Sequence, residues 1–374
     1  MNKKKPMAGL RIGAIVGLIL AWGAGGLASG DCPSLIASFK TPGMACGMTL
    51  IKTLGYLPEC GDTFQILNLS DPTHIKALWT HSWASLCSNG TLLESSALNG
   101  HWGFITYRCS PDATLTPGPT GLLILDMADP AAPVEQPRFE LTLPATAGFT
   151  AVAVAGDTAF VAAGTQGLHI YDISDPLHPA LLSQLDTQGY TEAVAVATGY
   201  VVLADRSLYG AEGEGVVVVD VTRIKNPRRV GAFTGAADPR RIVLDGDRAY
   251  ITDSGSPSDG TGAGLWVLDL STHASPGVLG FYATSQRSLG LAVVDGMSYI
   301  GLYNNEGHSS GLDIVKTVNP DKMIERGFFN TYGLTSGVAS LGNYIFFGIA
   351  QVLKVVDPTA CLASRHVRPV APPD

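Results

Sequence analysis

One short pattern recurs along this chain at a nearly constant interval, and it constrains the fold more than any other feature. Its clearest copy runs from Gly167 to Pro176 and reads GLHIYDISDP: a small residue, alternating apolar residues, an Asp and a Ser-Asp-Pro turn. The other copies are Phe64–Pro72, Gly121–Asp126, Gly215–Asp220, Gly264–Asp269, Gly311–Lys316 and Leu353–Pro358. The aligned positions 68, 126, 172, 220, 269, 316 and 357 are 58, 46, 48, 49, 47 and 41 residues apart. Such repetition indicates one supersecondary unit used many times, although length alone would suggest two domains.

Each interval has room for four short strands, here called A to D. In one unit the strands are expected at 151–154, 159–162, 168–173 and 180–185, with a Gly in the tight A–B hairpin. Val, Ile, Leu and Ala on both faces of these strands fit sheets that stack against neighbouring sheets. The sequence therefore predicts an all-β fold, a seven-bladed β-propeller of four-stranded antiparallel blades.

The cadence of the units 151–176 and 193–220, V-x-V followed by V-x-D-V/I-S-D-P, resembles that of LVIVD repeats from exported bacterial and archaeal proteins. The resemblance covers nearly the whole chain after its first thirty residues. It implies a propeller that is located at the cell surface or in the periplasm. It implies no reaction.

The first and last repeats are each incomplete. Residues 33–43 align without a gap with 179–189, so they form a strand D that no strands A to C precede. The last unit has strands A to C within 338–356 and no clear strand D. We therefore expect residues 33–39 to add the outer strand to the C-terminal blade and so to close the ring.

Six cysteines lie after residue 30, an even number without any Cys-x-x-Cys pair, which favours disulfides over a zinc site. The alignment of the repeats predicts Cys32–Cys361 across the C–D turn of the closing blade. It also predicts Cys46–Cys60 and Cys87–Cys109, each joining a D–A loop to a B–C loop. The alternative is that one or more of these thiols are free.

The first thirty residues read as a secretory signal, with a basic start, an apolar Gly-rich stretch and small residues at its end. An uncleaved anchor is the alternative and would be the chain's only link to a membrane. The expected organisation is a signal peptide at 1–30, the propeller at 31–361 and a tail at 362–374. Residues 1–30 carry four cations and no acid, so a total charge of −8 becomes −12 without them. An acidic exported chain without a basic patch is not a nucleic-acid binder. We expect a periplasmic, cell-surface or secreted protein.

The longest irregular loops, at 108–120, 205–214, 253–263 and 303–310, all lie on the face formed by the D–A and B–C loops. Insertions on one face of a repeat array often mark its binding side. The residues that open strand A should surround the mouth of the central channel on this face. The predicted binding residues are Thr150, Glu192, Arg240 and Ser336 from strands A, and Tyr209, Asp253, Asp259 and His308 from the loops.

Few residues on this face are candidates for catalysis or metal binding. Glu192 and Arg240 are expected to form a solvated ion pair between adjacent blades, with little effect on stability. Asp253 and Asp259 are weak candidates for calcium ligands. A simpler interpretation of Asp253 is a turn that caps strand B, because Asp205 aligns with it. No other cofactor, and no catalytic residue, is predicted.

Three classes of function remain open. The favoured one is a monomeric scaffold that binds an extracytoplasmic protein or glycan at the loop-rich face. A calcium-dependent propeller hydrolase or lactonase would need carboxylates from several strands A, where mainly Ala, Val and Leu are found. A quinone-cofactor dehydrogenase would need Trp-rich docking motifs that the repeats lack. Trp79 and Trp83 remain candidates for stacking against a sugar, whereas Trp266 is expected in the core.

Overall fold

The computed structural model describes residues 32–110, 118–144, 146–208, 213–256, 260–304, 310–331 and 333–363. The predicted signal peptide, and the predicted tail beyond residue 363, lie outside these ranges. No helix in the described ranges is long and apolar enough to cross a bilayer. The described residues belong to one unit of the chain, Cys32–Asp374.

The described strands pair into antiparallel sheets built from groups of four consecutive neighbours. The first two sheets contain β2 (Thr49–Ile51), β3 (Leu54–Pro58), β4 (Thr63–Asn68) and β5 (Lys76–Ser82), then β6 (Thr91–Asn99), β7 (Trp102–Cys109), β8 (Gly118–Asp126) and β10 (Phe139–Leu143), with the short β9 (Val134–Glu135) also on β8. An eight-stranded sheet follows, with β11 (Ala147–Ala155), β12 (Thr158–Gly164), β13 (Leu168–Asp172), β14 (Ala180–Leu185), β15 (Tyr190–Ala197), β16 (Tyr200–Arg206), β17 (Gly215–Asp220) and β18 (Arg228–Phe233). The bridge between its two halves is the single pair Gly164–Thr191.

The C-terminal half continues the pattern with three further sheets. They contain β19 (Pro239–Asp245), β20 (Arg248–Asp253), β21 (Gly264–Asp269) and β22 (Gly277–Ala283), then β23 (Arg287–Val294), β24 (Met297–Tyr303), β25 (Ser310–Lys316) and β26 (Ile324–Thr331), and finally β27 (Thr335–Leu341), β28 (Tyr344–Ile349), β29 (Val352–Asp357) and β1 (Ser34–Lys40). A 3-10 turn, η1 (Pro320–Lys322), precedes β26, and the short helix α1 (Thr359–Ala363) follows β29.

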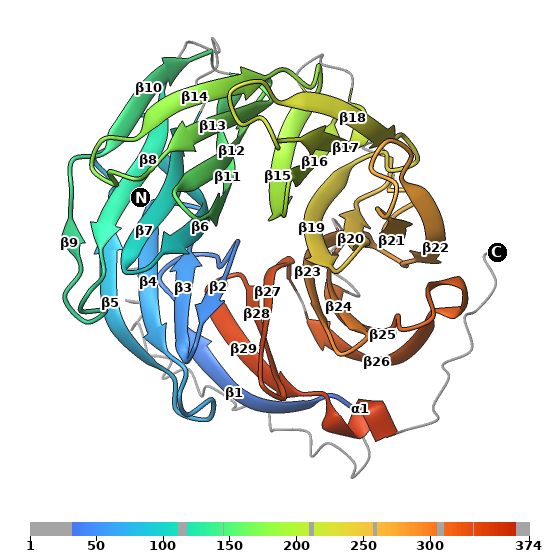
Figure 1. Ribbon diagram of the computed structural model, residues 1–374. Coiled ribbons are helices and arrows are strands. Elements are labelled where there is room, and N and C mark those ends of the chain that lie inside the picture. The colour runs from blue at the N-terminus through green and yellow to red at the C-terminus, as the bar shows by residue number, and fades with distance from the viewer. Residues whose placement is uncertain are drawn as a thin grey trace, which may run out of the picture. The chain divides into compact units, whose positions relative to one another are not determined.

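The sheets are arranged radially, and the first strand of each group lies innermost (Figure 1). We call β2, β6, β11, β15, β19, β23 and β27 the inner strands. Each inner strand contacts the next from β6 to β27, and the circle is completed where β27 contacts β2 and where β6 contacts β3. The inner strands thus surround a central channel.

The hydrophobic core is divided among the interfaces between successive sheets. One cluster joins Phe104 and Ile124 to Phe149 and Tyr171 of the following group, and clusters of the same kind lie at the other interfaces. The cluster that contains Leu57 and Phe346 joins the first sheet to the last. Because every sheet has a core on both faces, the middle strands are apolar on both faces.

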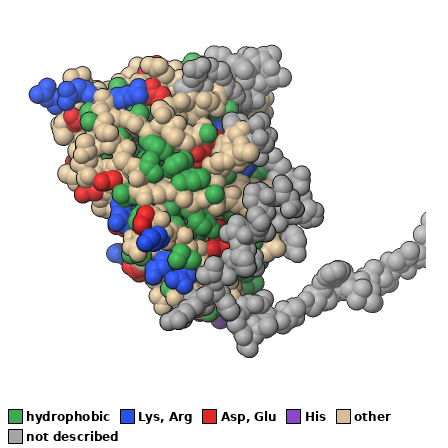
Figure 2. Space-filling model, turned by 90° about the vertical axis from the view of Figure 1, so that its right-hand side faces the viewer, with side chains coloured by type: hydrophobic (Ala, Val, Ile, Leu, Met, Phe, Trp, Pro, Cys, Tyr) green, Lys and Arg blue, Asp and Glu red, His purple; other side chains and the backbone are tan. Residues whose placement is uncertain are grey.

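Burial decreases toward the outer strands. The middle strand β12 is almost fully buried, whereas the outer strand β22 alternates between exposed and half-buried residues. Figure 2 shows the side of the molecule where β22 and β26 lie, with apolar side chains gathered in its middle and charged ones around them. Val278, Phe281 and Ile324 are among the exposed apolar side chains of these two strands.

The Asp of the repeated pattern terminates the third strand of a group. In six copies its carboxylate, or the amide oxygen of Asn68, accepts a hydrogen bond of 2.8 to 3.0 Å from the backbone N–H two residues later. This Asx turn satisfies a backbone donor where the ladder ends and starts the turn toward the fourth strand. Lys316 in the remaining copy has no oxygen for this bond.

The small residue of the pattern is fixed by the close approach of the fourth strand. A Cβ atom at any of five glycines would overlap a backbone carbonyl oxygen of that strand; these are Gly121, Gly167, Gly215, Gly264 and Gly311. The two groups that lack this Gly, with Thr63 and Val352 in its place, are the first and the last.

The closing sheet confirms the expected role of the leading segment. β1 pairs antiparallel with β29, from Ser34 opposite Asp357 to Lys40 opposite Val352. The cysteines form the three disulfides predicted from the alignment, and Cys32–Cys361, with Cα atoms 5.1 Å apart, spans 329 residues beside this pairing. Both of its sulfur atoms lie so close to Gly327 of β26 that a side chain there would displace them.

The steric role of the repeated Gly predicts an asymmetric pair of substitutions within one sheet. We expect Gly264→Ala to lower the free energy of unfolding by about 2 kcal/mol, because its new methyl group would overlap the carbonyl of Tyr282. Gly277→Ala at the start of β22 is the control, since the nearest atom to its new Cβ is 3.8 Å away. Urea denaturation of both variants measures the difference, and equal stability of the two would contradict the steric explanation.

Candidate functional site

A backbone irregularity recurs at the same place in the inner strands. The pairing of inner with second strand shifts between 93 and 96, 147 and 151, 191 and 193, 239 and 241, 288 and 290, and 335 and 338. A bulge leaves a residue outside the ladder and redirects its side chain. The predicted mouth residues Thr150, Glu192, Arg240 and Ser336 all lie at these shifts, and so does Glu94, which the sequence analysis did not select.

The residue at the bulge, or Cys46 just before β2 in the first group, is linked to the residue fourteen positions later, at or just after the end of the second strand. In four groups a bond joins the two side chains: the disulfide Cys46–Cys60, Glu94–Arg108 at 2.8 Å, Glu192–Arg206 at 3.1 Å and Arg240–Ser254 at 3.2 Å. We call these four links the cross-braces. They tie the start of the inner strand to the loop that follows the second strand, and so they fix the backbone around the channel mouth.

Two of the cross-braces, Glu192–Arg206 and Arg240–Ser254, join into one network across two neighbouring groups. Arg206 lies 3.1 Å from both Glu192 and Asp238, while Arg240 lies 2.7 Å from Asp238 and 3.7 Å from Glu192. The expected pairing of Glu192 with Arg240 is therefore present, but Arg206 is the closer partner. The side chains are 2 to 21% exposed, so this is a largely buried network and not the solvated surface pair that the sequence suggested.

The network keeps Glu192 ionised. Burial alone would raise the pKa of this carboxyl group, but the guanidinium groups of Arg206 and Arg240 outweigh that effect and hold its pKa below the usual value. A carboxylate held in this way is a structural anion and a poor proton donor near neutral pH.

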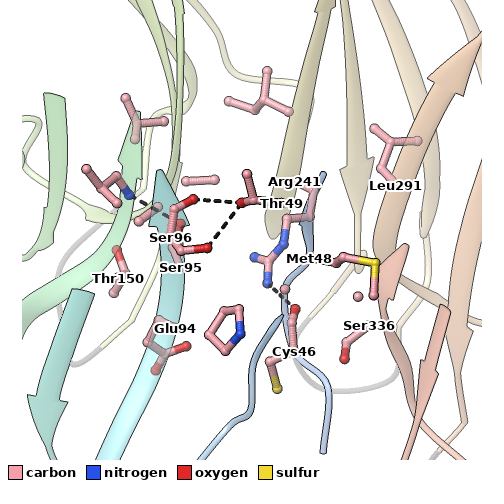
Figure 3. Close-up of a pocket in the computed structure, with 18 of the residues that line it drawn as sticks. Cys46, Met48, Thr49, Glu94, Ser95, Ser96, Thr150, Arg241, Leu291 and Ser336 are labelled. Atoms are coloured by element: carbon pink, nitrogen blue, oxygen red, sulfur yellow. Dashed lines mark hydrogen bonds between the residues drawn. The ribbon is translucent and has the colours of Figure 1, made fainter. Parts of the chain in front are cut away.

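The channel contains a cavity of about 170 Å³ at this level, to which every inner strand contributes (Figure 3). Its wall consists mainly of hydroxyl and small or branched apolar side chains, including Thr49, Ser95, Val152 and Leu291. Thr150 and Ser336 also line it, and their hydroxyl groups donate hydrogen bonds to backbone carbonyls of the neighbouring groups, Thr150 to Thr191 at 2.9 Å and Ser336 to Ala45 at 2.9 Å.

Arg241 supplies the guanidinium group of this wall, one residue after the bulge of β19. Its Nη1 donates to the carbonyl of Arg240 at 3.0 Å and its Nη2 to the carbonyl of Cys46 at 3.2 Å. Within the described ranges, no carboxylate lies within 4 Å of it. Arg241 was not among the predicted binding residues, although it follows Arg240 directly.

Asp253, one of the predicted binding residues of the loops, has a structural role in the described chain. Its side chain is buried and accepts four hydrogen bonds, from the backbone N–H groups of Ala237, Asp238 and Gly255 and from Nε1 of Trp266. It therefore supports the loop before β19, as the alternative interpretation of a capping Asp proposed. Tyr209, Asp259 and His308 lie outside the described residues, and among the described ones no three His, Cys, Asp or Glu side chains are grouped as metal ligands would be.

The same repeat position carries two further buried carboxylates. Asp205 accepts hydrogen bonds from Thr187 at 2.6 Å and from the backbone of Glu214 at 3.1 Å, and burial raises its pKa to about 6. Burial raises the pKa of Glu59 to about 7; one of its oxygens accepts from the backbone N–H of Gly43, and the other has no partner among the described residues.

Three of the tryptophans were assigned roles or left as candidates from the sequence, and the structure places Trp266 as expected. Trp266 packs between Phe233 and Phe281, as expected for a core residue. Trp79 and His81 stack on one face of β5 with ring centroids 5.4 Å apart, and Trp83 contacts both of them edge-on. The indole N–H of Trp83 is bonded to Glu135, so this ring is held by the second sheet.

Comparison with known proteins supports the fold. The model of the LVIVD repeat matches residues 150–187 and 236–284, and no curated protein matches the chain by sequence. The WD40 β-propeller domain of Doa1 superimposes with a TM-score of 0.60 at 10% identity, covering 89% of this chain and 100% of that one. BamB from Moraxella catarrhalis gives 0.53 at 11% identity, covering 90% and 99%, and a functionally unknown protein from Desulfotomaculum acetoxidans DSM 771 gives 0.58 at 9%, covering 79% and 88%. The fold is thus an all-β propeller with four-stranded antiparallel blades.

The buried network predicts that Arg206 is important for stability. We expect Arg206→Gln to lower the free energy of unfolding by about 3 kcal/mol, because Glu192 and Asp238 would lose their shared cation in a largely buried setting. Arg228→Gln is the control, since Arg228 is 63% exposed and pairs with Asp220 on the surface. Thermal or urea unfolding measures both, and a loss below about 1 kcal/mol in Arg206→Gln would show that the network adds little.

The raised pKa of Glu59 predicts that stability falls as the pH rises from 5 to 8. The folded protein binds a proton at Glu59 up to a pH of about 7, whereas the unfolded chain releases it near 4.5. This contribution is complete below 4.5 and is lost as the pH rises through 7. Glu59→Gln should remove roughly 2 kcal/mol of this fall. Urea midpoints at pH 5 and pH 8 test the effect, with Asp157→Asn in an exposed hairpin as the control. An unchanged slope in Glu59→Gln would contradict it.

Proposed function

The chain carries LVIVD repeats folded as a β-propeller, and from this premise we propose that it is an extracytoplasmic binding scaffold whose ligand enters the channel mouth. The ring consists of seven blades, closed by β1. The eight-stranded sheet counts as two of them, because one residue pair joins halves that each have four strands and a separate core on either face. Its three disulfides are typical of an oxidising compartment, which here is the periplasm, the cell surface or the medium.

The observation that carries this proposal is that the carboxylates at the channel mouth are paired with arginines. Glu94, Glu192 and Asp238 are each bound to an arginine, and apart from Glu94 and Arg241 the described cavity wall is made of hydroxyl and apolar groups. Pre-formed concave sites of this composition bind ligands through shape and a few fixed polar contacts. The partner is an extracytoplasmic protein segment or glycan, and the protein acts as a monomer.

The arrangement gives less support to a calcium-dependent hydrolase or lactonase. Such an enzyme needs several carboxylates that converge on one ion or on a water molecule. On the described inner strands, the acidic side chains nearest the channel mouth are Glu94 and Glu192, and each is neutralised by its cross-brace.

A variant that narrows the channel tests the proposal. The full-length protein, Ala151→Phe and Asp157→Phe are compared on glycan and peptide arrays, with and without calcium. Ala151 lines the cavity, whereas Asp157 is exposed in the hairpin at the opposite end of the same strand, β11. Ligands of the native protein should bind Ala151→Phe at least tenfold more weakly and Asp157→Phe unchanged, at equal thermal stability of the two variants.

Two outcomes would reject the scaffold assignment. One is a set of array ligands that bind both variants equally, because binding would then lie elsewhere on the molecule. The other is calcium-dependent turnover of esters or lactones by the native protein that Ala151→Phe loses, which would identify the channel as an active site.

A further inference from the structure

We propose that the channel recognises a carboxylate group, held by Arg241; this inference deepens the proposed function and rests on it. The shared chemistry is a single carboxylate on a small apolar or hydroxylated body. The C-terminal end of a peptide and an acidic sugar both provide it.

The charge balance at the channel mouth is the first argument. Glu94 pairs with Arg108, and Glu192 and Asp238 pair with Arg206 and Arg240, so three carboxylates balance three guanidinium groups. Arg241 adds a fourth cation, for which the described residues provide no carboxylate within 4 Å. Among the described residues that line the cavity, Arg241 is the one cation, and the one carboxylate, Glu94, is already paired with Arg108.

Arg241 is also held in a fixed orientation. Two backbone carbonyls fix its guanidinium group, those of Arg240 and Cys46, and Thr252 Oγ1 accepts a hydrogen bond from its backbone N–H at 3.1 Å. A guanidinium group has five N–H donors, so three of them have no acceptor among the described residues. A cation fixed by neutral carbonyls keeps its full charge and an orientation set in advance, which suits the planar carboxylate.

The cavity around Arg241 supplies the rest of a binding site (Figure 3). Ser95 accepts a hydrogen bond from the backbone of Val152 at 3.4 Å, and its own hydroxyl hydrogen has no acceptor among the described residues. Met48, Leu291 and Val338 provide apolar surface on the same wall. A polar donor and apolar surface beside a fixed cation fit a carboxylate attached to a small carbon skeleton.

The volume of the cavity excludes ligands larger than a terminal group, and its charge favours a carboxylate over a phosphate group. The volume of about 170 Å³ is close to that of a cavity that holds one benzene molecule, so it admits a terminal group and not a folded segment or a nucleotide. The single guanidinium group of Arg241 matches a monoanion, whereas a phosphate group carries nearly two negative charges at neutral pH.

Matched acid and neutral probes test the inference with the full-length protein. N-acetylalanine is compared with N-acetylalaninamide, and glucuronate with glucose, by ligand-detected NMR titration, with inorganic phosphate as the competing anion. We expect one acid of the two pairs to bind at least tenfold more tightly than its neutral partner. Which pair shows the preference distinguishes a peptide end from an acidic sugar.

Substitutions locate the effect. Arg241→Gln should abolish the preference for the acid, and Arg241→Lys should retain only part of it, because the charge stays while the two-pronged geometry is lost. Arg228→Gln, which removes an exposed arginine outside the channel, should leave the preference unchanged. If Arg241→Gln does not fold, Arg241→Lys and the acid–amide difference of the native protein still decide the question.

Three results would overturn the inference: equal binding of acid and neutral probes, a preference that survives in Arg241→Gln, and tighter binding of phosphate than of either acid. Each is distinct from failure of the scaffold proposal. Array ligands that Ala151→Phe loses, without any preference for carboxylates, would leave the channel as the binding site and remove only the role of Arg241.

Discussion

The pairing of β1 with β29 is the interaction on which the rest of the architecture depends. Every other four-stranded group is made of strands that follow one another in the chain, so each can form from local hairpins. The last group cannot, because its outer strand comes from the other end of the described chain. Once that strand is added, the last sheet is complete and the core around Leu57 and Phe346 can join it to the first. The inner strands then surround a channel with a fixed diameter, and the mouth residues reach the distances at which they can bond.

Much of the fold could be predicted because the repeated residues perform repeated tasks. The Asp that ends the pattern forms an Asx turn, and the Gly that begins it makes room for a neighbouring carbonyl, so both must recur wherever the unit recurs. The disulfides followed from the same alignment, since aligned positions occupy equivalent places in successive sheets. The number of separate sheets could not be predicted in the same way, because the bridge between Gly164 and Thr191 merges two groups of four strands into one sheet.

The site was predicted only in outline, and the reason is physical. Thr150, Glu192, Arg240 and Ser336 could be found because they open the inner strands. Their partners are contributed by a different strand or a neighbouring group, and a linear pattern does not show which side chains a bulge brings together. Arg206 stood at the end of a second strand and looked like part of a loop. Asp253 looked exposed because it borders a long loop, yet that loop is built on its buried carboxylate.

The cross-braces have a consequence for how such rings tolerate change. A covalent bond, two ion pairs and a hydrogen bond from an arginine to a serine hydroxyl occupy equivalent positions of one scaffold, each closing the same fourteen-residue span. The backbone geometry of that span is thus compatible with chemically unrelated links, and the type of link in one sheet does not determine the type in the next. In a propeller of this kind, substitutions can change the charge of the channel mouth in one sheet at a time without changing the backbone of the ring. Ligand recognition can therefore evolve separately from folding.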